Sequence, residues 1–281
     1  MKLFRSATYF AAVFIFVHVA IAETTDTSTA PQRAADNNAN NRPTLFLIGD
    51  STVKNGSGRG EGGLWGWGQV LTPLFDGERI NVENHAIGGR SSRTFLTEGR
   101  WDRVVEKLQP GDFVLIQFGH NDGGELFEGD RPRASIKGNG EETRDGVVAM
   151  TGKSETVHSY GWYLRRYIAD AKAKGATPIV LSPVPRNIWR DGHVARASGD
   201  YGKWAAEAAE QGGAEFVDLN ELIARRYEQA GEDTVKNDYF TSADHTHTTE
   251  AGAHINAECV AAGLREAELP IAKYLIESPS Y

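Results

Sequence analysis

Four short polar clusters contain the residue types that acyl-ester hydrolysis through a serine requires. Ser51 follows an apolar run, at Gly49-Asp50-Ser51. Further along the chain stand Gly88-Gly89-Arg90-Ser91, Gly119-His120-Asn121-Asp122 and Asp244-His245-Thr246-His247. This chemistry needs a nucleophile, a base, a group that orients the base, and hydrogen-bond donors for the oxyanion of the tetrahedral intermediate. Ser51 is the candidate nucleophile, although its local motif alone fits a helix cap equally well.

The base and its orienting carboxylate are expected in the last cluster. Asp244 and His247 are three residues apart, immediately before a predicted helix. In a tight turn this spacing lets the carboxylate reach the imidazole Nδ1–H and leaves Nε2 free to act as base. His245 is a competing base, but Asp244 is its direct neighbour and orients it less well. The alternative is that these residues cap the helix and leave a histidine on the surface.

Three hydrogen-bond donors are candidates for an oxyanion hole. Asn121 offers a side-chain N–H without a charge, and Gly89 can bring its backbone N–H close to a ligand because it has no Cβ. The backbone N–H of Ser51 is the third donor, and a helix that starts there would add a favourable dipole. A lone glycine or asparagine more often serves the turn in which it lies. The prediction therefore depends on all four clusters meeting in space.

The segments between the clusters predict that they meet. Strand-like runs occur at 44–48, 80–84, 113–118, 178–182 and 215–219, and helix-like segments at 65–75, 101–108, 159–174, 201–212, 221–230 and 248–267. Such alternation indicates βαβ units and a parallel sheet with helices on both faces. Open α/β sheets bind ligands at the carboxyl ends of their strands, where the serine, glycine and asparagine clusters stand. The glycine-rich stretch 56–63 and the long polar stretch 123–156, which has only weak helical signals, are expected on the same face as Ser51.

The ends of the chain predict export. Residues 1–22 combine a short basic start, an apolar run and a small-x-small end, which is typical of a signal peptide. An uncleaved membrane anchor is the alternative. Residues 23–43 are polar and lack apolar periodicity, which predicts a disordered linker, and residues 44–281 suffice for one α/β domain. We therefore expect a secreted or periplasmic protein without stable membrane insertion after signal cleavage.

Charge and cysteine content limit the partners. The formal net charge of −8 argues against a nucleic-acid partner, because phosphate binding needs concentrated positive charge. An acidic polysaccharide remains open, since a local arginine cluster can bind one sugar acid. The single cysteine, Cys259, cannot form an internal disulfide and is expected in the core. The oligomeric state stays open, with a monomer as a plausible form.

The four clusters, in this order, resemble the GDSL/SGNH hydrolase superfamily, which is named for its Ser, Gly, Asn and His blocks. The likeness is closer to the rhamnogalacturonan acetylesterase branch. The shared text is Gly-Asp-Ser-Thr at 49–52, Gly-Arg-Ser-x-Arg at 89–93, Phe-Gly-His-Asn-Asp-Gly at 118–123, and Asp-His-Thr-His-Thr at 244–248 with Ala-Gly-Ala at 251–253. The resemblance covers about residues 44–265 and implies a flavodoxin-like three-layer α/β/α sandwich with a central five-stranded parallel sheet. Fungal members use disulfides, which this chain cannot form.

Carried over by position, the resemblance assigns the site. Ser51, Asp244 and His247 would form the catalytic triad, and Ser51, Gly89 and Asn121 the oxyanion hole, with no metal and no cofactor. The implied reaction removes O-acetyl groups from galacturonic acid residues of the pectic polysaccharide rhamnogalacturonan I, through an acetyl-enzyme intermediate. Because 123–156 is a variable region, the resemblance does not transfer the substrate contacts made there.

Four residues are candidates for substrate contacts. Arg90 and Arg93 lie beside the predicted oxyanion loop, where a guanidinium could pair with a uronic acid carboxylate. They could equally bond to backbone carbonyls or to Glu98. Trp65 and its neighbour Trp67 could stack on sugar rings or lie in the core.

Other functions remain open from the residues. An esterase of this kind could act on another glycan, such as xylan, or on a small ester. His245, His247 and Asp244, with His120 or Asp122, could instead hold a catalytic zinc ion, although no second ligand cluster accompanies them. A non-catalytic carbohydrate-binding protein on the same scaffold is the third possibility, because a fold does not fix a function.

Overall fold

The computed structural model describes residues 42–196 and 199–277. The predicted signal peptide (1–22), and the predicted linker up to residue 41, lie outside the described residues. Within those two ranges, none of the helices combines the length and the apolar character needed to cross a bilayer.

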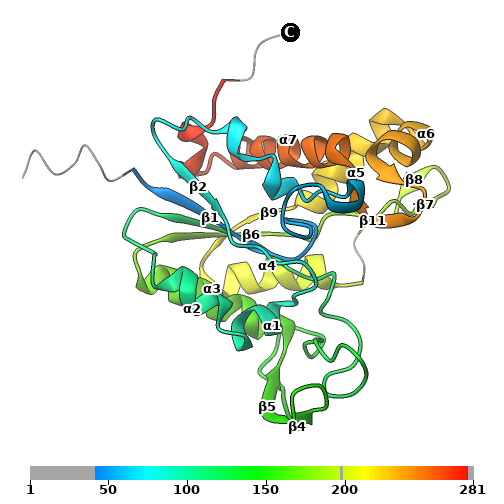
Figure 1. The fold of residues 1–281 in the computed structure, drawn as a ribbon. Helices are drawn as coiled ribbons and strands as arrows, with labels where there is room; N and C mark the ends of the chain where they lie inside the picture. The colour runs from blue at the N-terminus through cyan, green and yellow to red at the C-terminus, as the bar shows by residue number, and fades with distance from the viewer. Residues whose placement is uncertain (1–41, 197–198, 278–281) are drawn as a thin grey trace, which may run out of the picture. The chain divides into compact units, whose positions relative to one another are not determined.

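Five parallel strands form the central sheet, in the order β2-β1-β3-β6-β9 (Figure 1). They are β1 (Thr44–Gly49), β2 (Asn81–Asn84), β3 (Phe113–Gln117), β6 (Thr177–Leu181) and β9 (Glu215–Val217). All five strand predictions are confirmed, with small differences at the ends. From β1 the chain goes to β2 on one side, and the later strands add on the other side. The strand order therefore reverses beside β1 and β3, which is where sheets of this topology bind ligands.

Alternate strand residues build two separate cores, one on each face of the sheet. Leu45 and Leu47 of β1 pack in the core that contains α5 (Leu219–Ala230) and α7 (Glu250–Glu266). Their neighbours in β1 face the other core, which contains α3 (Tyr160–Ala173) and α4 (Tyr201–Gly212). Strands covered on both faces carry no polar alternation. Figure 1 shows the two helix pairs on opposite sides of the sheet, which confirms the three-layer α/β/α sandwich.

The other helices and hairpins are short. The helices are α1 (Ser92–Thr97), α2 (Arg100–Val105) and α6 (Glu232–Thr234), and the hairpins pair β4 (Thr143–Val148) with β5 (Lys153–His158), β7 (Trp189–Arg190) with β8 (His193–Val194), and β10 (Phe240–Thr241) with β11 (Asp244–Thr248). Single turns of 3-10 helix lie at Glu61–Gly63, Trp67–Gln69, Thr72–Leu74 and Pro270–Tyr274, and a π-helical turn at Val235–Tyr239.

The helix predicted over 65–75 is wrong. The segment contains two separate 3-10 turns instead of one α-helix. The reason is the close approach of Gly66 and Gly68 to Val53. A Cβ on Gly66 would lie 2.4 Å from the Val53 carbonyl carbon, so the backbone itself packs there and no side chain fits.

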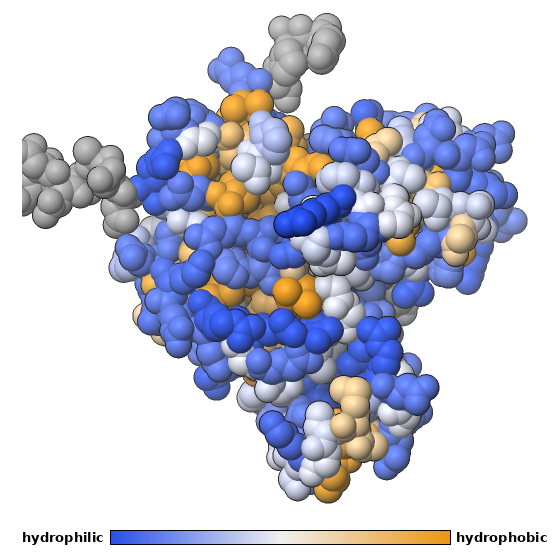
Figure 2. All heavy atoms as spheres, viewed as in Figure 1, coloured by the Kyte–Doolittle hydropathy of each residue, from blue (hydrophilic) through white to orange (hydrophobic). Residues whose placement is uncertain are grey.

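The polar stretch 123–156, whose sequence has only weak helical signals, forms strand β4 and most of strand β5. The pair is antiparallel and mostly exposed on both faces, so its sequence carries no alternating pattern. Figure 1 shows the hairpin projecting from the domain near α1, and Figure 2 shows apolar side chains on it. Val147 and Met150 are 54% and 67% exposed.

Candidate active site

The structure brings the serine cluster and the last cluster into contact. Ser51 Oγ lies 2.7 Å from His247 Nε2. On the other side of the ring, His247 Nδ1 lies 2.7 Å from Asp244 Oδ2. The three side chains thus form one hydrogen-bonded chain, in which the carboxylate accepts from Nδ1–H and Nε2 can accept the serine proton.

The Asp244 carboxylate is held as an anion by its own turn. Its Oδ1 accepts hydrogen bonds from the backbone N–H of Thr246 at 2.7 Å and of His247 at 2.9 Å. Burial acts to raise the pKa of Asp244, but these hydrogen bonds and the contact with the His247 ring outweigh it and hold the pKa below its ordinary value. The carboxylate therefore stays ionised, and it fixes the orientation of the imidazole.

Strand β11, which carries Asp244 and His247, is fixed by main-chain hydrogen bonds. Trp65 N donates to Thr248 O at 2.8 Å, and Asn187 N donates to His245 O at 2.8 Å. The side chain of His245 is exposed and makes no hydrogen bond with Ser51 or with Asp244. Between the two histidines, only His247 has the geometry of a base.

Ser51 lies in a single hydrogen-bonded turn directly after β1. The N–H groups of Val53 and Lys54 both donate to Asp50 O, at 3.2 and 3.0 Å. No helix continues from this turn, because the next element is the 3-10 turn at Glu61–Gly63. The helix dipole expected at Ser51 is therefore absent, and stabilisation of an oxyanion depends on individual hydrogen-bond donors.

A chain of buried hydrogen bonds supports the turn. Asp50 Oδ1 accepts from Thr52 N at 2.9 Å and from Thr52 Oγ1 at 2.7 Å. Gln117 Nε2 donates to Thr52 Oγ1 at 2.7 Å, and Trp67 Nε1 donates to Gln117 Oε1 at 2.8 Å. Thr52 and Gln117 were not predicted from the sequence, although a glutamine at the end of an apolar strand was a signal. Trp67 is 1% exposed and belongs to this support, so it makes no stacking contact with a sugar.

Gly49 lets the turn pack tightly against β3. A Cβ at this position would lie 2.5 Å from Gln117 O and 2.6 Å from Val53 Cγ2. No other residue type fits without moving one of them, which explains the glycine that precedes Asp50 and Ser51.

The glycine and asparagine clusters also reach this position. A Cβ on Gly88 would stand 3.5 Å from Ser51 Cβ, so the loop after β2 packs against the serine. Gly89 has φ +76°, a left-handed conformation that favours glycine. Asn121 is 7% exposed, and its Nδ2 donates to Arg90 O at 3.0 Å, which leaves a second N–H available. Ser51, the Gly89 loop and Asn121 thus form one connected unit.

Asp122, next to Asn121, joins three segments. Its carboxylate accepts from Ser92 N at 3.1 Å, from the Ser92 hydroxyl, and from Ser135 Oγ at 3.0 Å. Burial raises the pKa of Asp122 to about 6. The side chain ties the end of β3 to the start of α1 and to the 123–156 stretch, so it positions the loops around Ser51.

The zinc interpretation finds no support in this geometry. Across the described ranges, no group of three or more His, Cys, Asp or Glu is arranged to hold a metal ion. Both ring nitrogens of His247 are engaged by Ser51 and Asp244, and the Asp122 carboxylate is engaged by serines.

The expected substrate contact by Arg93 is corrected by the structure. Arg93 is 1% exposed. Its Nε donates to Glu155 Oε1 at 2.6 Å, and its Nη1 donates to Leu126 O at 2.7 Å and to Ala134 O at 2.9 Å. Because the guanidinium is buried and engaged by protein groups, Arg93 anchors the 123–156 stretch and does not face a ligand.

Arg90 and Trp65 remain near the site. Arg90 donates to Glu98 Oε2 at 2.9 Å and to Gly88 O at 3.2 Å, as the alternative interpretation expected, and it is partly exposed beside Gly89. Trp65 is partly buried. Its backbone bridges to β11, and its ring lies against Gly60, where a Cβ would come within 2.6 Å.

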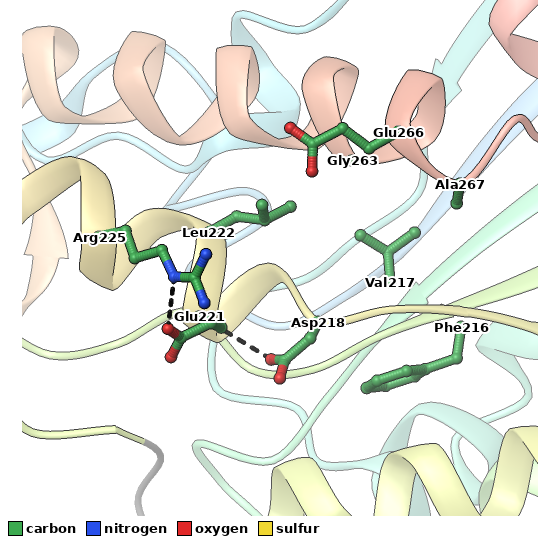
Figure 3. A pocket seen from close by; sticks show the side chains of 9 residues that line it. All are labelled: Phe216, Val217, Asp218, Glu221, Leu222, Arg225, Gly263, Glu266 and Ala267. Atoms are coloured by element: carbon green, nitrogen blue, oxygen red, sulfur yellow. Dashed lines mark hydrogen bonds and ion pairs between the residues drawn. The ribbon is translucent and has the colours of Figure 1, made fainter.

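A groove of about 350 Å³ lies elsewhere, at the end of β9 (Figure 3). Asp218 and Glu221 come from the start of α5, and Glu266 from the end of α7. Glu221 Oε1 accepts from Arg225 Nε at 2.6 Å. This groove contains neither Ser51 nor His247, so the candidate active site is the one around Ser51.

A serine, histidine and aspartate joined in this way at the edge of an α/β/α sandwich define a serine carboxylic ester hydrolase. Residues 47–255 match the model of the GDSL-like lipase/acylhydrolase family, and the chain belongs to this family. A rhamnogalacturonan acetylesterase of Emericella nidulans is 35% identical over 76% of this chain and 82% of that protein. A probable rhamnogalacturonan acetylesterase of Bacillus subtilis, YesY, is 32% identical over 83% of this chain and 97% of that protein.

Solved structures share the fold. Protein YxiM of Bacillus subtilis aligns with a TM-score of 0.64 and 24% identity, over 82% of this chain and 58% of that chain. The acetylxylan esterase Axe2 of Geobacillus stearothermophilus aligns with a TM-score of 0.53 and 18% identity, over 84% of this chain and 97% of that chain. At these identities the likeness concerns the fold alone.

Proposed function

We propose that this protein removes O-acetyl groups from a pectic polysaccharide, rhamnogalacturonan I. The observation that carries the proposal is the hydrogen-bonded chain from Ser51 through His247 to Asp244. The acetyl ester and the polymer are supported by two relatives named as rhamnogalacturonan acetylesterases, at 35% and 32% identity. Export by the predicted signal peptide belongs to the same proposal, because a polysaccharide is too large to enter a cell intact.

In the first half of the reaction, Ser51 Oγ attacks the acetyl carbonyl carbon. Its proton passes to His247 Nε2, and the Asp244 carboxylate stabilises the imidazolium that forms. The oxyanion accepts hydrogen bonds from the N–H groups of Ser51, Gly89 and the Asn121 side chain. The bond between the carbonyl carbon and the sugar oxygen then breaks, and His247 gives its proton to the departing hydroxyl.

In the second half, water attacks the acetyl group on Ser51. His247 Nε2 accepts a proton from the water, and the same donors bind the second oxyanion. The bond to Ser51 Oγ breaks, His247 returns the proton to the serine, and acetate leaves. His247 serves as the base in both halves because both halves break an ester at the carbonyl carbon of the same acetyl group.

The test is acetate release from acetylated rhamnogalacturonan by wild type and by Ser51→Ala. We expect the variant to lose about 10⁴-fold or more in kcat, as removal of the nucleophile does in other triad hydrolases. Ser154→Ala, an exposed serine of β5, is the matched control and is expected to match wild type. Turnover by Ser51→Ala at the wild-type rate would exclude the serine mechanism.

Acetylated xylan and a small acetyl ester, assayed in parallel, test the substrate separately. We expect the wild-type kcat/KM to be highest on acetylated rhamnogalacturonan. A higher value on xylan would correct the polymer and keep the chemistry. Binding of pectic oligosaccharide without acetate release from any ester would favour the non-catalytic interpretation.

A further inference from the structure

A groove of about 260 Å³ opens beside the Gly89 loop, and three arginines line it. Its walls include Gly89, Arg90, Glu98, Arg131, Arg133 and Met150. Arg90 belongs to the loop after β2, whereas Arg131, Arg133 and Met150 belong to the 123–156 stretch. The groove therefore lies between the 123–156 stretch, which has no assigned role, and the proposed oxyanion hole.

The guanidinium groups of Arg131 and Arg133 converge on Gly89. The position of a Cβ on Gly89 would be 2.5 Å from Arg131 Nη2 and 3.4 Å from Arg133 Nη1. Arg133 Nη1 also donates to Gly89 O at 3.1 Å. A side chain at position 89 would meet the tips of these two flexible side chains, so it is the left-handed φ of +76° that favours glycine here.

No carboxylate among the residues that line the groove is free to balance its positive charge. The one carboxylate in its wall, Glu98, already accepts from Arg90 at 2.9 Å and from Arg100 at 2.6 Å. Arg131 makes no hydrogen bond or ion pair with any residue in 42–196 or 199–277. Among the described residues, the side chain of Arg133 bonds only to the carbonyl of Gly89. In a chain of net charge −8, this local excess of cations favours a bound anion.

The backbone around these arginines is fixed before any ligand binds. Ser91 Oγ donates to Arg133 O at 2.5 Å, and Ser135 Oγ donates to the buried Asp122 at 3.0 Å. Burial and the neighbouring charge of Arg131 lower the pKa of Arg133, against the attraction of Asp50 and Asp122. Two like charges held this close point to a shared anionic partner.

We infer that Arg131 and Arg133 bind the carboxylate of a uronic acid in the substrate. The inference rests on the proposed function. A guanidinium can donate two parallel hydrogen bonds to a carboxylate. The hydroxyl groups of neutral sugars carry no charge and do not accept such a charge-assisted pair. The Gly89 N–H is the proposed donor to the acetyl oxygen, so the carboxylate binds within about one sugar residue of the ester. Met150, which is 67% exposed, offers an apolar contact to a sugar ring at the edge of the groove.

The experiment compares Arg131→Gln with wild type on three substrates. These are an acetylated rhamnogalacturonan oligosaccharide, the same oligosaccharide with its carboxyl groups reduced to alcohols, and p-nitrophenyl acetate. We expect KM for the acidic oligosaccharide to rise about 10-fold with kcat nearly unchanged, as for the loss of one charge-assisted hydrogen bond. Values on the other two substrates are expected to stay within about twofold of wild type.

Two variants sharpen the result. Arg103→Gln, an exposed arginine of α2, makes the same change of net charge and is expected to leave all three substrates unaffected. Arg131→Lys keeps the charge without the planar fork, so we expect it to recover part of the affinity for the acidic oligosaccharide. Added salt is expected to weaken acidic substrate binding to wild type more than to Arg131→Gln.

The outcomes separate this inference from the proposed function. Equal losses on the acidic and the reduced oligosaccharide would show that Arg131 supports the loop, and no change on either would show that it binds no carboxylate. Both results would overturn the subsite and leave the esterase intact. If wild type releases acetate from neutral esters but not from the acidic oligosaccharide, the pectic substrate and the subsite both fail.

Discussion

Two parts of the site are held in place by different kinds of contact. Strand β11, which carries Asp244 and His247, is positioned by main-chain hydrogen bonds to Trp65 and Asn187. The 123–156 stretch, which carries the groove arginines, is attached by main-chain hydrogen bonds, such as Tyr160 N to Ile136 O at 2.8 Å, and in addition by buried side chains. The most buried of these are Arg93, paired with Glu155, and Asp122, bonded to Ser92 and Ser135.

The residues that carry out the reaction and the residues proposed to bind the polymer are therefore held in place in different ways. Main-chain hydrogen bonds depend little on which side chains surround them, so the base keeps its position when nearby residues change. Buried side-chain pairs can be lost through one substitution. We therefore expect substitutions in the anchor of the 123–156 stretch to affect stability and polymer binding more than the intrinsic reaction on a small ester.

The largest effect is expected from Asp244→Asn. The amide oxygen can still accept from the Thr246 and His247 N–H groups, so the turn should persist. The amide nitrogen cannot accept from His247 Nδ1–H, which leaves the imidazole in the wrong tautomer. We expect kcat on p-nitrophenyl acetate to fall about 10³- to 10⁴-fold. A loss below about tenfold would show that orientation of the base does not depend on Asp244.

The next effect concerns the anchor, through Arg93→Met. The change leaves Glu155 and two carbonyls without their buried donor, so we expect the free energy of unfolding to fall by about 3–5 kcal/mol, measured by urea denaturation. Arg225→Met removes an exposed pair with Glu221 and serves as control, with an expected loss below about 1 kcal/mol. Adding Glu155→Leu to Arg93→Met should recover part of the loss. Equal losses in the two single variants would remove the distinction between anchor and surface pair.

The smallest effect separates two carboxylates by their response to pH. Folding lowers the pKa of Asp244, so its contribution to stability is present above the unfolded-chain value and is lost as the pH falls. Folding raises the pKa of Asp122 from 3.8 to about 6, so the folded chain binds the extra proton between these values. Stability from Asp122 is therefore lost as the pH rises from about 4 to 6, by up to about 3 kcal/mol.

Asp122→Asn tests this response, because the amide cannot ionise and its oxygen still accepts from Ser92 and Ser135. We expect the unfolding free energy of wild type, relative to the variant, to decrease as the pH rises over that interval. Asp102→Asn, at an exposed position of α2, should show no such trend. Parallel curves for wild type and Asp122→Asn would mean that folding does not raise the pKa of Asp122.

The sequence by itself determined the sheet and the identity of the polar clusters. Apolar runs such as 113–118 are long enough to predict buried strands, and parallel strands place the residues that follow them at one edge. The spacing of Asp244 and His247 is a local property, so their contact could be predicted from the chain alone. The closeness of Gly88 to Ser51 followed from the same topology.

Only the tertiary structure decided which arginines are paired within the protein and which line a groove without such a partner. Arg93 and Arg131 are both arginines in polar surroundings, and no local pattern distinguishes them. Packing places Arg93 beside Glu155, from the distant strand β5, and leaves Arg131 beside Gly89 with no carboxylate. The two glycines that break the helix expected over 65–75 act in the same way, because their partner is the backbone of Val53. A local pattern records the propensity of a segment, whereas the burial of a charge depends on which remote segment covers it.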